Sequence, residues 1–429
     1  MHASNRQDWM SIRRSRTTDA LAQATSEGLT GFTVAAREGK QVTLADGQGF
    51  TEFVSCSYLG LENHPALIDA AKRAMVRTGL HLSSSRGAMR PVYLEQLEAL
   101  LAQMYPGSAV CVFSSTSSVH LGVLPLLGSG SLPGYRPERP VHWLMDKTAH
   151  ASMQVLRGVL EQFGQVVRVD CTRPGSLEQA LHECKRLQRT PILLVDGIGS
   201  MSGLVPVAAL CRELESAGGF VYVDDAHGIS IVGKHGCGYA FTDVGLGLPK
   251  NLVLAGSLSK AFGGAGGFAV VSGLDDVKVI STSANPLVFG HSIMVPMLAA
   301  NVAAALLHLS PELAVLQNRL WANVSLFDAL TDNSLMNAGV QSPVRGALFA
   351  NEEAGLAAAR LLRDDGFLVF PVFYPIVPQG QAMLRFAVSS EHTQADIRRL
   401  ATTLREVSQR GLQWLHPDES RNANLVDLK

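Results

Sequence analysis

The feature that most constrains the fold is a series of short, almost wholly apolar segments separated by longer amphipathic stretches. The apolar segments occupy residues 109–113, 141–145, 191–195, 220–223, 252–255 and 268–271. Strands that are apolar on both faces are typical of a parallel or mixed sheet that helices cover on each side. The sequence therefore predicts an α/β core.

Polar or glycine-rich residues directly follow most of these apolar segments. They occupy residues 114–118, 146–150, 196–203, 224–227 and 257–260. Ligands of open α/β sheets bind beyond the carboxyl ends of the strands. We therefore expect these five segments to converge on one crevice.

The length of the chain, 429 residues, allows one large and one small domain, each with its own core. We expect residues 56–300 to form the large domain and residues 301–429 to form a smaller C-terminal α+β domain. Strand and helix patterns alternate in the smaller domain over residues 342–349, 352–365, 367–373 and 383–388. Residues 1–55 are expected to pack on the small domain or on a dimer partner.

Composition excludes several classes of function. With 36 basic and 37 acidic residues the chain has no electrostatic footprint for nucleic acid. The six cysteines are scattered and give no metal-ligand spacing, so no metal site is expected. No apolar run approaches the roughly 20 residues of a membrane span, and the polar N-terminus does not resemble a signal peptide. These features predict a cytoplasmic protein, and a hydrophobic content of 47% favours an oligomer with a buried interface.

Two of the polar segments together indicate a pyridoxal phosphate site. Asp224 and His227 directly follow the apolar run 220–223, and Lys260 lies among hydroxyl and glycine residues after the run 252–255. That cofactor requires a carboxylate for its pyridinium nitrogen, a donor for its phenolic oxygen and an amine to form a Schiff base. Taken singly, Asp224 and His227 can equally be a capping aspartate and a structural histidine, and a lysine by itself is more often a surface residue.

Three further sites are consistent with this cofactor and an amino-acid substrate. Residues 114–118 begin a predicted helix whose N-terminus suits a phosphate, with Ser257 as an additional hydroxyl; the alternative is an ordinary helix cap. His150 can stack on the cofactor ring or be a core histidine. Arg385 lies in an apolar strand, where a buried charge needs an anionic partner. A substrate carboxylate and a structural ion pair both satisfy that need.

With these motifs the chain resembles the α-oxoamine synthases, which are fold type I pyridoxal phosphate enzymes with an aspartate aminotransferase-like fold. The resemblance extends from residue 58 to residue 393. It is densest in five segments, residues 58–65, 196–203, 223–227, 256–264 and 378–385.

This resemblance implies a role for each matching residue. Lys260 corresponds to the Schiff-base lysine, Asp224 to the pyridinium partner, His227 to the partner of the phenolic oxygen and His150 to the ring-stacking residue. Those four are the implied catalytic residues. Cofactor binding is further implied for Thr116, Ser117, Ser200, Ser257 and Ser292, with Ser292 in a segment that reaches the phosphate from the second subunit of a homodimer. Arg385 corresponds to the arginine that binds the substrate carboxylate.

Two segments depart from the family pattern. Cys56 and Ser57 stand where the family usually has asparagine, and they are the remaining candidates for substrate binding. Residues 89–93 replace a Gly-Thr and histidine motif that helps to define the substrate pocket. Arg86 and Arg90 nearby can meet the phosphates of coenzyme A or of a carrier-protein arm, or be structural. We therefore expect substrates that differ from the family's standard ones.

The resemblance implies a pyridoxal phosphate-dependent C-acyltransferase. It condenses an amino acid with an acyl-thioester of coenzyme A or a carrier protein, with decarboxylation, and gives an α-aminoketone for a specialised biosynthetic or signalling pathway. An aminotransferase or an aldol-type lyase that acts on an amino acid is the nearest alternative. A non-catalytic binding protein with the same fold is a second alternative.

Overall fold

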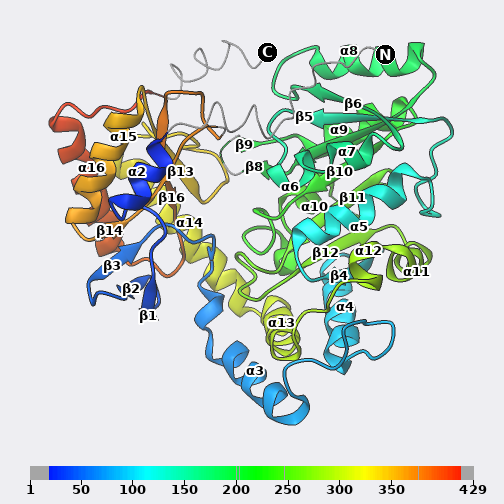
Figure 1. Cartoon of the computed structure of the whole chain (residues 1–429), viewed down its shortest axis with the longest axis horizontal. Helices are drawn as coiled ribbons and strands as arrows, with labels where there is room; N and C mark the ends of the chain where they lie inside the picture. The colour runs from blue at the N-terminus through cyan, green and yellow to red at the C-terminus, as the bar shows by residue number, and fades with distance from the viewer. Residues whose placement is uncertain (1–18, 200, 202, 246, 375, 417–429) are drawn as a thin grey trace. The chain divides into compact units, whose positions relative to one another are not determined.

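The computed structural model describes residues 19–416 except 200, 202, 246 and 375, and these divide into two compact units (Figure 1). Leu59–Asn318 forms the large unit. The described residues up to Tyr58 and from Arg319 onward form the small unit. The domain boundaries predicted after residues 55 and 300 stay a prediction.

A seven-stranded sheet in the order β4-β12-β11-β10-β7-β5-β6 forms the centre of the large unit. Strands β11, β10, β7, β5 and β6 run parallel, and β12 is antiparallel to both of its neighbours. Residues 258–266 between β11 and β12 are too few for a crossover, so the chain turns back on itself. The predicted α/β fold with a mostly parallel central sheet is confirmed. The strands are β4 (Ala109–Phe113), β5 (Val141–Asp146), β6 (Gly164–Val169), β7 (Thr190–Asp196), β10 (Phe220–Asp224), β11 (Leu252–Ser257) and β12 (Gly267–Val271).

Helices surround this sheet, and a small hairpin lies beside it. Helix α5 packs on β4, β11 and β12, and helix α9 packs on β7 and β10. Buried side chains of α5 and the sheet form one apolar cluster around Trp143. The hairpin is β8 (Ile198–Gly199) and β9 (Gly203–Leu204), and the helices are η1 (Leu61–Asn63), α3 (Pro65–Thr78), α4 (Val92–Met104), α5 (Thr116–Gly128), α6 (Ala151–Gln154), α7 (Arg157–Leu160), α8 (Ser176–Arg186), α9 (Val207–Ser216), η2 (Lys234–Gly236), α10 (Tyr239–Val244), α11 (Leu274–Ser283), α12 (Asn285–Val288) and α13 (Val295–His308).

Two small sheets and the helices that pack on them form the small unit. Its three N-terminal strands form one sheet with β14 in the order β1-β2-β3-β14, and the second sheet, β13-β16-β15, is antiparallel. The predicted element at residues 367–373 divides between the two sheets, because β14 pairs with β3 and β15 pairs with β16. Helix α14 (Glu312–Leu330) begins in the large unit and ends here. The other elements are α2 (Ala20–Ser26), β1 (Val34–Glu38), β2 (Gln41–Leu44), β3 (Gly49–Glu52), β13 (Val344–Phe349), α15 (Glu352–Asp364), β14 (Phe367–Leu368), β15 (Phe370–Val372), β16 (Ala382–Ala387) and α16 (Gln394–Gln409).

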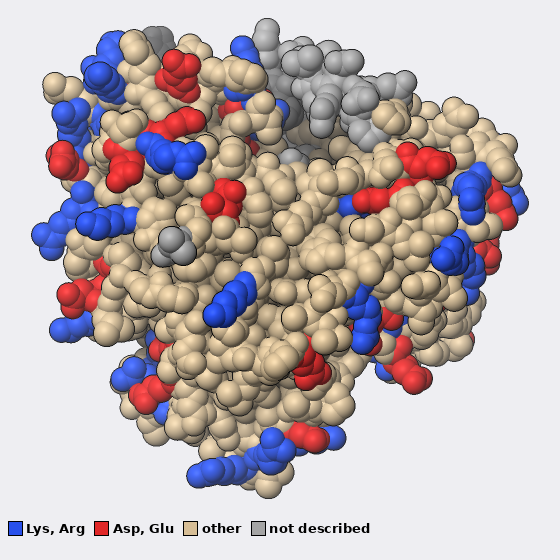
Figure 2. Space-filling view, turned by 180° about the vertical axis from the view of Figure 1, so that it is seen from behind, with Lys and Arg blue, Asp and Glu red and all other residues tan. Residues whose placement is uncertain are grey.

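Neither sign of charge dominates the face of the molecule that Figure 2 shows. On the face in Figure 2, basic and acidic side chains are interspersed over a largely uncharged surface. Within the described part of the chain, no helix is by itself both long and apolar enough to cross a membrane. Helices α13 and α14 meet that criterion only as a bent pair.

Candidate active site

Three aspartates lie side by side at the carboxyl edge of the central sheet. Asp146, Asp196 and Asp224 each end a strand, and Asp224 is in register with Asp196 across the β10–β7 pair. All three are at most 7% exposed. The carboxyl ends of parallel strands are where ligands bind in this class of sheet, so the buried acids mark the candidate site in the large unit.

Asp224 is held as an anion by a histidine that the sequence analysis did not single out. His120 of α5 is fully buried, and its Nε2 lies 3.1 Å from Asp224 Oδ2. The other ring nitrogen, Nδ1, lies 2.8 Å from the Tyr222 hydroxyl, and the Ala226 N–H donates to Asp224 Oδ1. Burial favours a higher pKa for Asp224, but the hydrogen bond and charge of His120, with the charge of Lys260, lower this pKa to about 2.

In contrast to Asp224, the neighbouring acids Asp196 and Asp225 have raised pKa values. Burial, and then the charge of Asp224, raise the pKa of Asp196 well above its ordinary value, although the His150 N–H donates to its Oδ1 at 3.0 Å. Burial likewise raises the pKa of Asp225. The site therefore concentrates its negative charge on Asp224, which suits a cationic ring nitrogen placed beside that carboxylate.

Lys260 lies in a tight turn between β11 and β12 that a buried asparagine holds in place. Asn301 of α13 accepts from the Ala265 N–H at 3.1 Å and donates to the Ala265 carbonyl at 2.8 Å. A Cβ on Gly264 would lie 1.8 Å from Asn301 Oδ1, and Gly263 has φ +84°, so both positions require glycine. The charge of Lys260 acts on Asp224, Asp196 and His150, which places the ammonium within electrostatic reach of the acids.

Two histidines border this group. His150 caps helix α6 and has an accessible ring, whose Nδ1 lies 2.7 Å from Ser152 Oγ. Partial desolvation lowers the pKa of His150, and Lys260 adds to the effect while Asp224 opposes it. A neutral, accessible imidazole is suited to stacking on a ring. His227 is 8% exposed and lies in the turn that follows Asp224.

The N-terminus of α5 lies at the same edge of the sheet and carries hydroxyl groups, as a predicted phosphate site requires. Ser115 caps the helix by accepting from the Ser118 N–H at 3.0 Å. Thr116 Oγ1 donates to the Gly256 carbonyl at 3.4 Å and so connects the helix to β11, which carries Ser257. Helix N-termini with flanking hydroxyls bind phosphate. Ser117 belongs to this first helical turn, and Ser200 lies outside the described residues.

The surroundings of Ser292 and Arg86 differ in what they imply for the predicted roles of these residues. Ser292 lines a small cavity together with Ser114 and Arg86 of the same chain, and within the described structure its buried Oγ has no hydrogen-bond partner. Arg86 is 6% exposed, donates to the Val112 carbonyl at 2.6 Å and pairs with Glu98 at 3.4 Å. These internal bonds favour the structural interpretation of Arg86.

A separate group surrounds Arg385 in the small unit. Arg385 Nη2 lies 3.3 Å from the Cys56 sulfur, and the Tyr58 hydroxyl also faces the guanidinium. Arg385 Nε is buried and has no hydrogen-bond partner among the described residues. The guanidinium therefore retains donor capacity for an anion, as a substrate carboxylate requires.

The residues of the large unit suit pyridoxal phosphate in charge and in donor chemistry. Asp224 is ionised, Lys260 is within electrostatic reach, and a capped helix N-terminus with hydroxyls lies at the same sheet edge. The roles of the individual residues stay predictions. His120 and Asn301 are additions from the structure. The one signal for His120 in the sequence is a histidine within the apolar run that follows residues 114–118.

Comparison with known proteins identifies a matching family model, relatives in sequence and a solved structure with the same fold. Residues 50–404 match the family model described as aminotransferase class I and II. The chain is 31% identical to 8-amino-7-oxononanoate synthase of Geobacter sulfurreducens over 87% of this chain and 93% of that protein. It is 28% identical to 2-amino-3-ketobutyrate coenzyme A ligase of Salmonella typhimurium over 89% and 94%. The solved serine palmitoyltransferase of Sphingomonas wittichii matches 94% of this chain and 98% of its own, with a TM-score of 0.81 at 19% identity, and so shares the fold.

Proposed function

We propose that this chain, which belongs to the pyridoxal phosphate-dependent α-oxoamine synthases within aminotransferase class I and II, condenses an amino acid with an acyl-thioester and releases carbon dioxide. The observation that carries the proposal is the ionised Asp224, supported by His120, at the same sheet edge as Lys260 and the α5 N-terminus. The product is an α-aminoketone.

The protein's part in this chemistry is to bind, orient and move protons. When bound, pyridoxal phosphate supplies an electron sink for negative charge at the amino-acid Cα. Asp224 holds a proton on the ring nitrogen because its carboxylate stays ionised. Lys260 would hold the cofactor covalently through its amine, and the amine that the incoming amino acid displaces would then be free to accept the Cα proton.

Other residues position the reactants. The first turn of α5, with Thr116 and Ser117, holds the phosphate together with Ser257. His150 presents its ring for stacking, and His227 donates to the phenolic oxygen. Arg385 binds the amino-acid carboxylate through its guanidinium fork. Thr116 Oγ1 already bonds to the Gly256 carbonyl, so the phosphate-binding turn is fixed relative to the strand that leads to Lys260.

Release of free thiol distinguishes condensation from other reactions of the same cofactor. We expect thiol release from an acyl-coenzyme A or acyl-carrier-protein donor only when an amino acid is also present, with one carbon dioxide per thiol. Each purified donor and amino acid should be tested alone and in pairs, with thiol and carbon dioxide measured together. Keto-acid formation from the amino acid alone indicates an aminotransferase, and aldehyde release indicates a lyase. Absence of any cofactor absorbance indicates a binding protein.

A homodimer is part of the proposal, and a set of exposed apolar residues in the large unit supports it. Met75 and Val76 of α3 are 46% and 86% exposed, Leu80 is 57% exposed and Phe289 is 83% exposed. Their segments are connected, because the Val295 N–H donates to the Leu80 carbonyl and Ser85 donates to the Val288 carbonyl. Exposed apolar residues on connected segments are typical of a subunit interface.

A charge placed in this apolar set should prevent dimer formation. For Val76→Glu we expect a shift from dimer to monomer, because a carboxylate buried in an apolar interface loses its hydration. Light scattering after size-exclusion chromatography measures the mass. Leu274→Glu, at a residue of α11 that is 79% exposed, is the matched control and should leave the dimer intact. A Val76→Glu protein with unchanged mass would place the interface elsewhere.

A further inference from the structure

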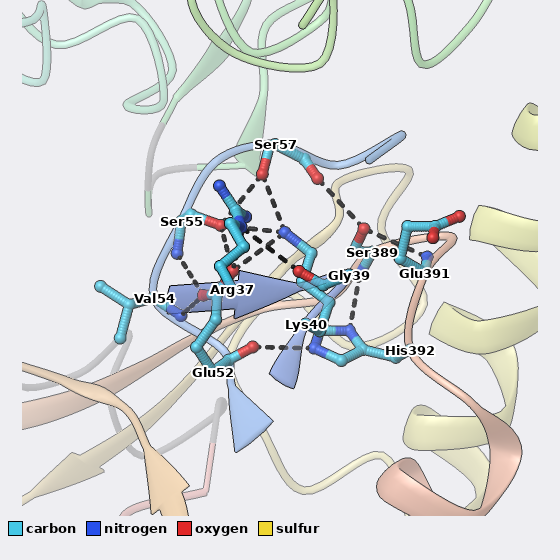
Figure 3. Close-up of polar contacts among 10 residues, drawn as sticks. All are labelled: Arg37, Gly39, Lys40, Glu52, Val54, Ser55, Ser57, Ser389, Glu391 and His392. Carbon is cyan, nitrogen blue, oxygen red and sulfur yellow. Dashed lines mark hydrogen bonds and ion pairs between the residues drawn. The ribbon is translucent and has the colours of Figure 1, made fainter. Parts of the chain in front are cut away.

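A buried lysine in the small unit holds the segment that carries Cys56. Lys40 lies in the turn between β1 and β2 and is 3% exposed. Its ammonium lies 3.0 Å from Glu52 Oε1, 2.9 Å from Ser55 Oγ and 2.8 Å from Ser57 Oγ. Figure 3 shows these groups converging on Lys40. A buried ammonium requires such partners, so Lys40 fixes the side chains on both sides of Cys56.

Glu52 fixes the backbone of the same segment. Its Oε2 accepts from the N–H groups of Val54 and Ser55, both at 2.8 Å. Burial favours a higher pKa for Glu52, but Lys40 and then Ser55 lower it, so the carboxylate is ionised opposite the ammonium. The ion pair therefore orders residues 54–57 through both partners.

The far side of the segment is tied to the turn after β16. Ser389 Oγ donates to the Ser57 carbonyl at 3.1 Å, and the Ser390 N–H donates to the Tyr58 carbonyl at 2.8 Å. His392 stabilises this turn, since its Nδ1 accepts from the Ser389 N–H while its Nε2 donates to the Glu52 carbonyl. The segment is thus anchored at both ends, as Figure 3 shows.

The anchored segment contacts Arg385, the residue that the proposed function assigns to the substrate carboxylate. Cys56 Sγ lies 3.3 Å from Arg385 Nη2, and Tyr58 is fully buried and faces the same guanidinium. A guanidinium binds a carboxylate well only when its fork is oriented in advance. We infer that Lys40 is a positioning residue for amino-acid binding, which acts by fixing Cys56 and Tyr58 against Arg385.

This inference rests on the proposed function through the assignment of Arg385 to the substrate carboxylate. For Lys40→Met we expect the dissociation constant of the amino acid, measured by titrating the absorbance of the bound cofactor without acyl donor, to rise about tenfold, as loss of oriented charge-assisted bonds implies. The turnover number at saturating amino acid should stay within about twofold, since no group of the large unit changes.

A second readout needs neither cofactor nor activity. We expect N-ethylmaleimide to label Cys56 several-fold faster in Lys40→Met than in the unaltered protein, with the modified peptide quantified by mass spectrometry. Arg345→Met is the matched control, because Arg345 is a buried cation of the same unit whose ion pair with Asp328 does not contact residues 54–58. It should lower the unfolding temperature yet leave both the labelling rate of Cys56 and the dissociation constant unchanged.

Ser55→Ala keeps the ion pair and tests the same positioning role if Lys40→Met does not fold. It should also raise the dissociation constant of the amino acid, by a smaller factor than Lys40→Met does. Arg385→Met tests the assignment of Arg385 separately from the positioning role of Lys40. If it leaves amino-acid binding unchanged, the assignment of Arg385 in the proposed function is wrong. If it weakens binding while Lys40→Met and Ser55→Ala act no more strongly than Arg345→Met, the positioning role of Lys40 is overturned.

Discussion

Lys260→Ala is expected to lower turnover by at least about 10³-fold, the largest effect of any single substitution in this chain. The substitution removes the amine that we propose to attach the cofactor covalently and, once displaced, to accept the Cα proton. Two measurements check it: the rate of thiol release, and the amount of cofactor that remains attached after borohydride treatment and denaturation. Both should fall to background.

The control for this prediction is Lys250→Ala in the same unit. Lys250 is an exposed lysine beyond the site, and its loss should leave turnover and attached cofactor unchanged. The turn around Lys260 is fixed mainly by backbone bonds and by Asn301, so Lys260→Ala should retain the unfolding temperature within a few degrees. Retained thiol release in a folded Lys260→Ala protein would refute the assignment of Lys260.

Sequence patterns were sufficient for six of the seven strands of the central sheet because those strands are almost wholly buried, whereas the edge strand β6, which is only partly buried, was not predicted. Continuous apolar runs such as residues 220–223 and 252–255 have no solvent-facing alternation, so their class and their place in the core could be predicted. The polar residues directly after those runs, including Asp224 and Lys260, were predictable as site residues because ligands bind beyond the carboxyl ends of such strands. The division of residues 367–373 between two sheets was not, because the partner strands β3 and β16 are far away in the sequence.

The residues that the sequence analysis missed share a physical cause. His120, Asn301 and Lys40 are polar side chains that are almost completely buried, and each is satisfied by partners at least 12 residues away in the sequence. In the sequence Lys40 belongs to a charged hairpin and is indistinguishable from a solvated lysine. Only tertiary contacts show that its charge is internal.

His120 affects the proposed chemistry indirectly, because it keeps Asp224 ionised although no contact between His120 and the cofactor is predicted. The pKa of Asp224, about 2, lies below its ordinary value of 3.8. Its ionisation therefore stabilises the folded state at pH values above about 4, and that contribution is lost as the pH falls toward 2. For His120→Leu we expect the pKa of Asp224 to rise and acid unfolding to begin at a higher pH.

Asp224→Asn is expected to lower turnover by about 10³-fold, because a neutral amide cannot keep the cofactor's ring nitrogen protonated. His120→Leu should cost roughly 10- to 100-fold, as expected for loss of a hydrogen bond to a buried charge. His120→Gln, which can still donate to Asp224, should recover most of that loss. Turnover and the absorbance of the bound cofactor measure all three.

The double variant identifies how the two residues act. If His120 works only by holding Asp224 as an anion, His120→Leu combined with Asp224→Asn should be no slower than Asp224→Asn alone. The acid-unfolding curve of Asp224→Asn should likewise be insensitive to His120→Leu between pH 2 and 4, because the ionisation that His120 supports is already absent. Additive losses in turnover would show instead that His120 contributes by a route independent of Asp224, such as the position of Tyr222, to which its Nδ1 is bonded.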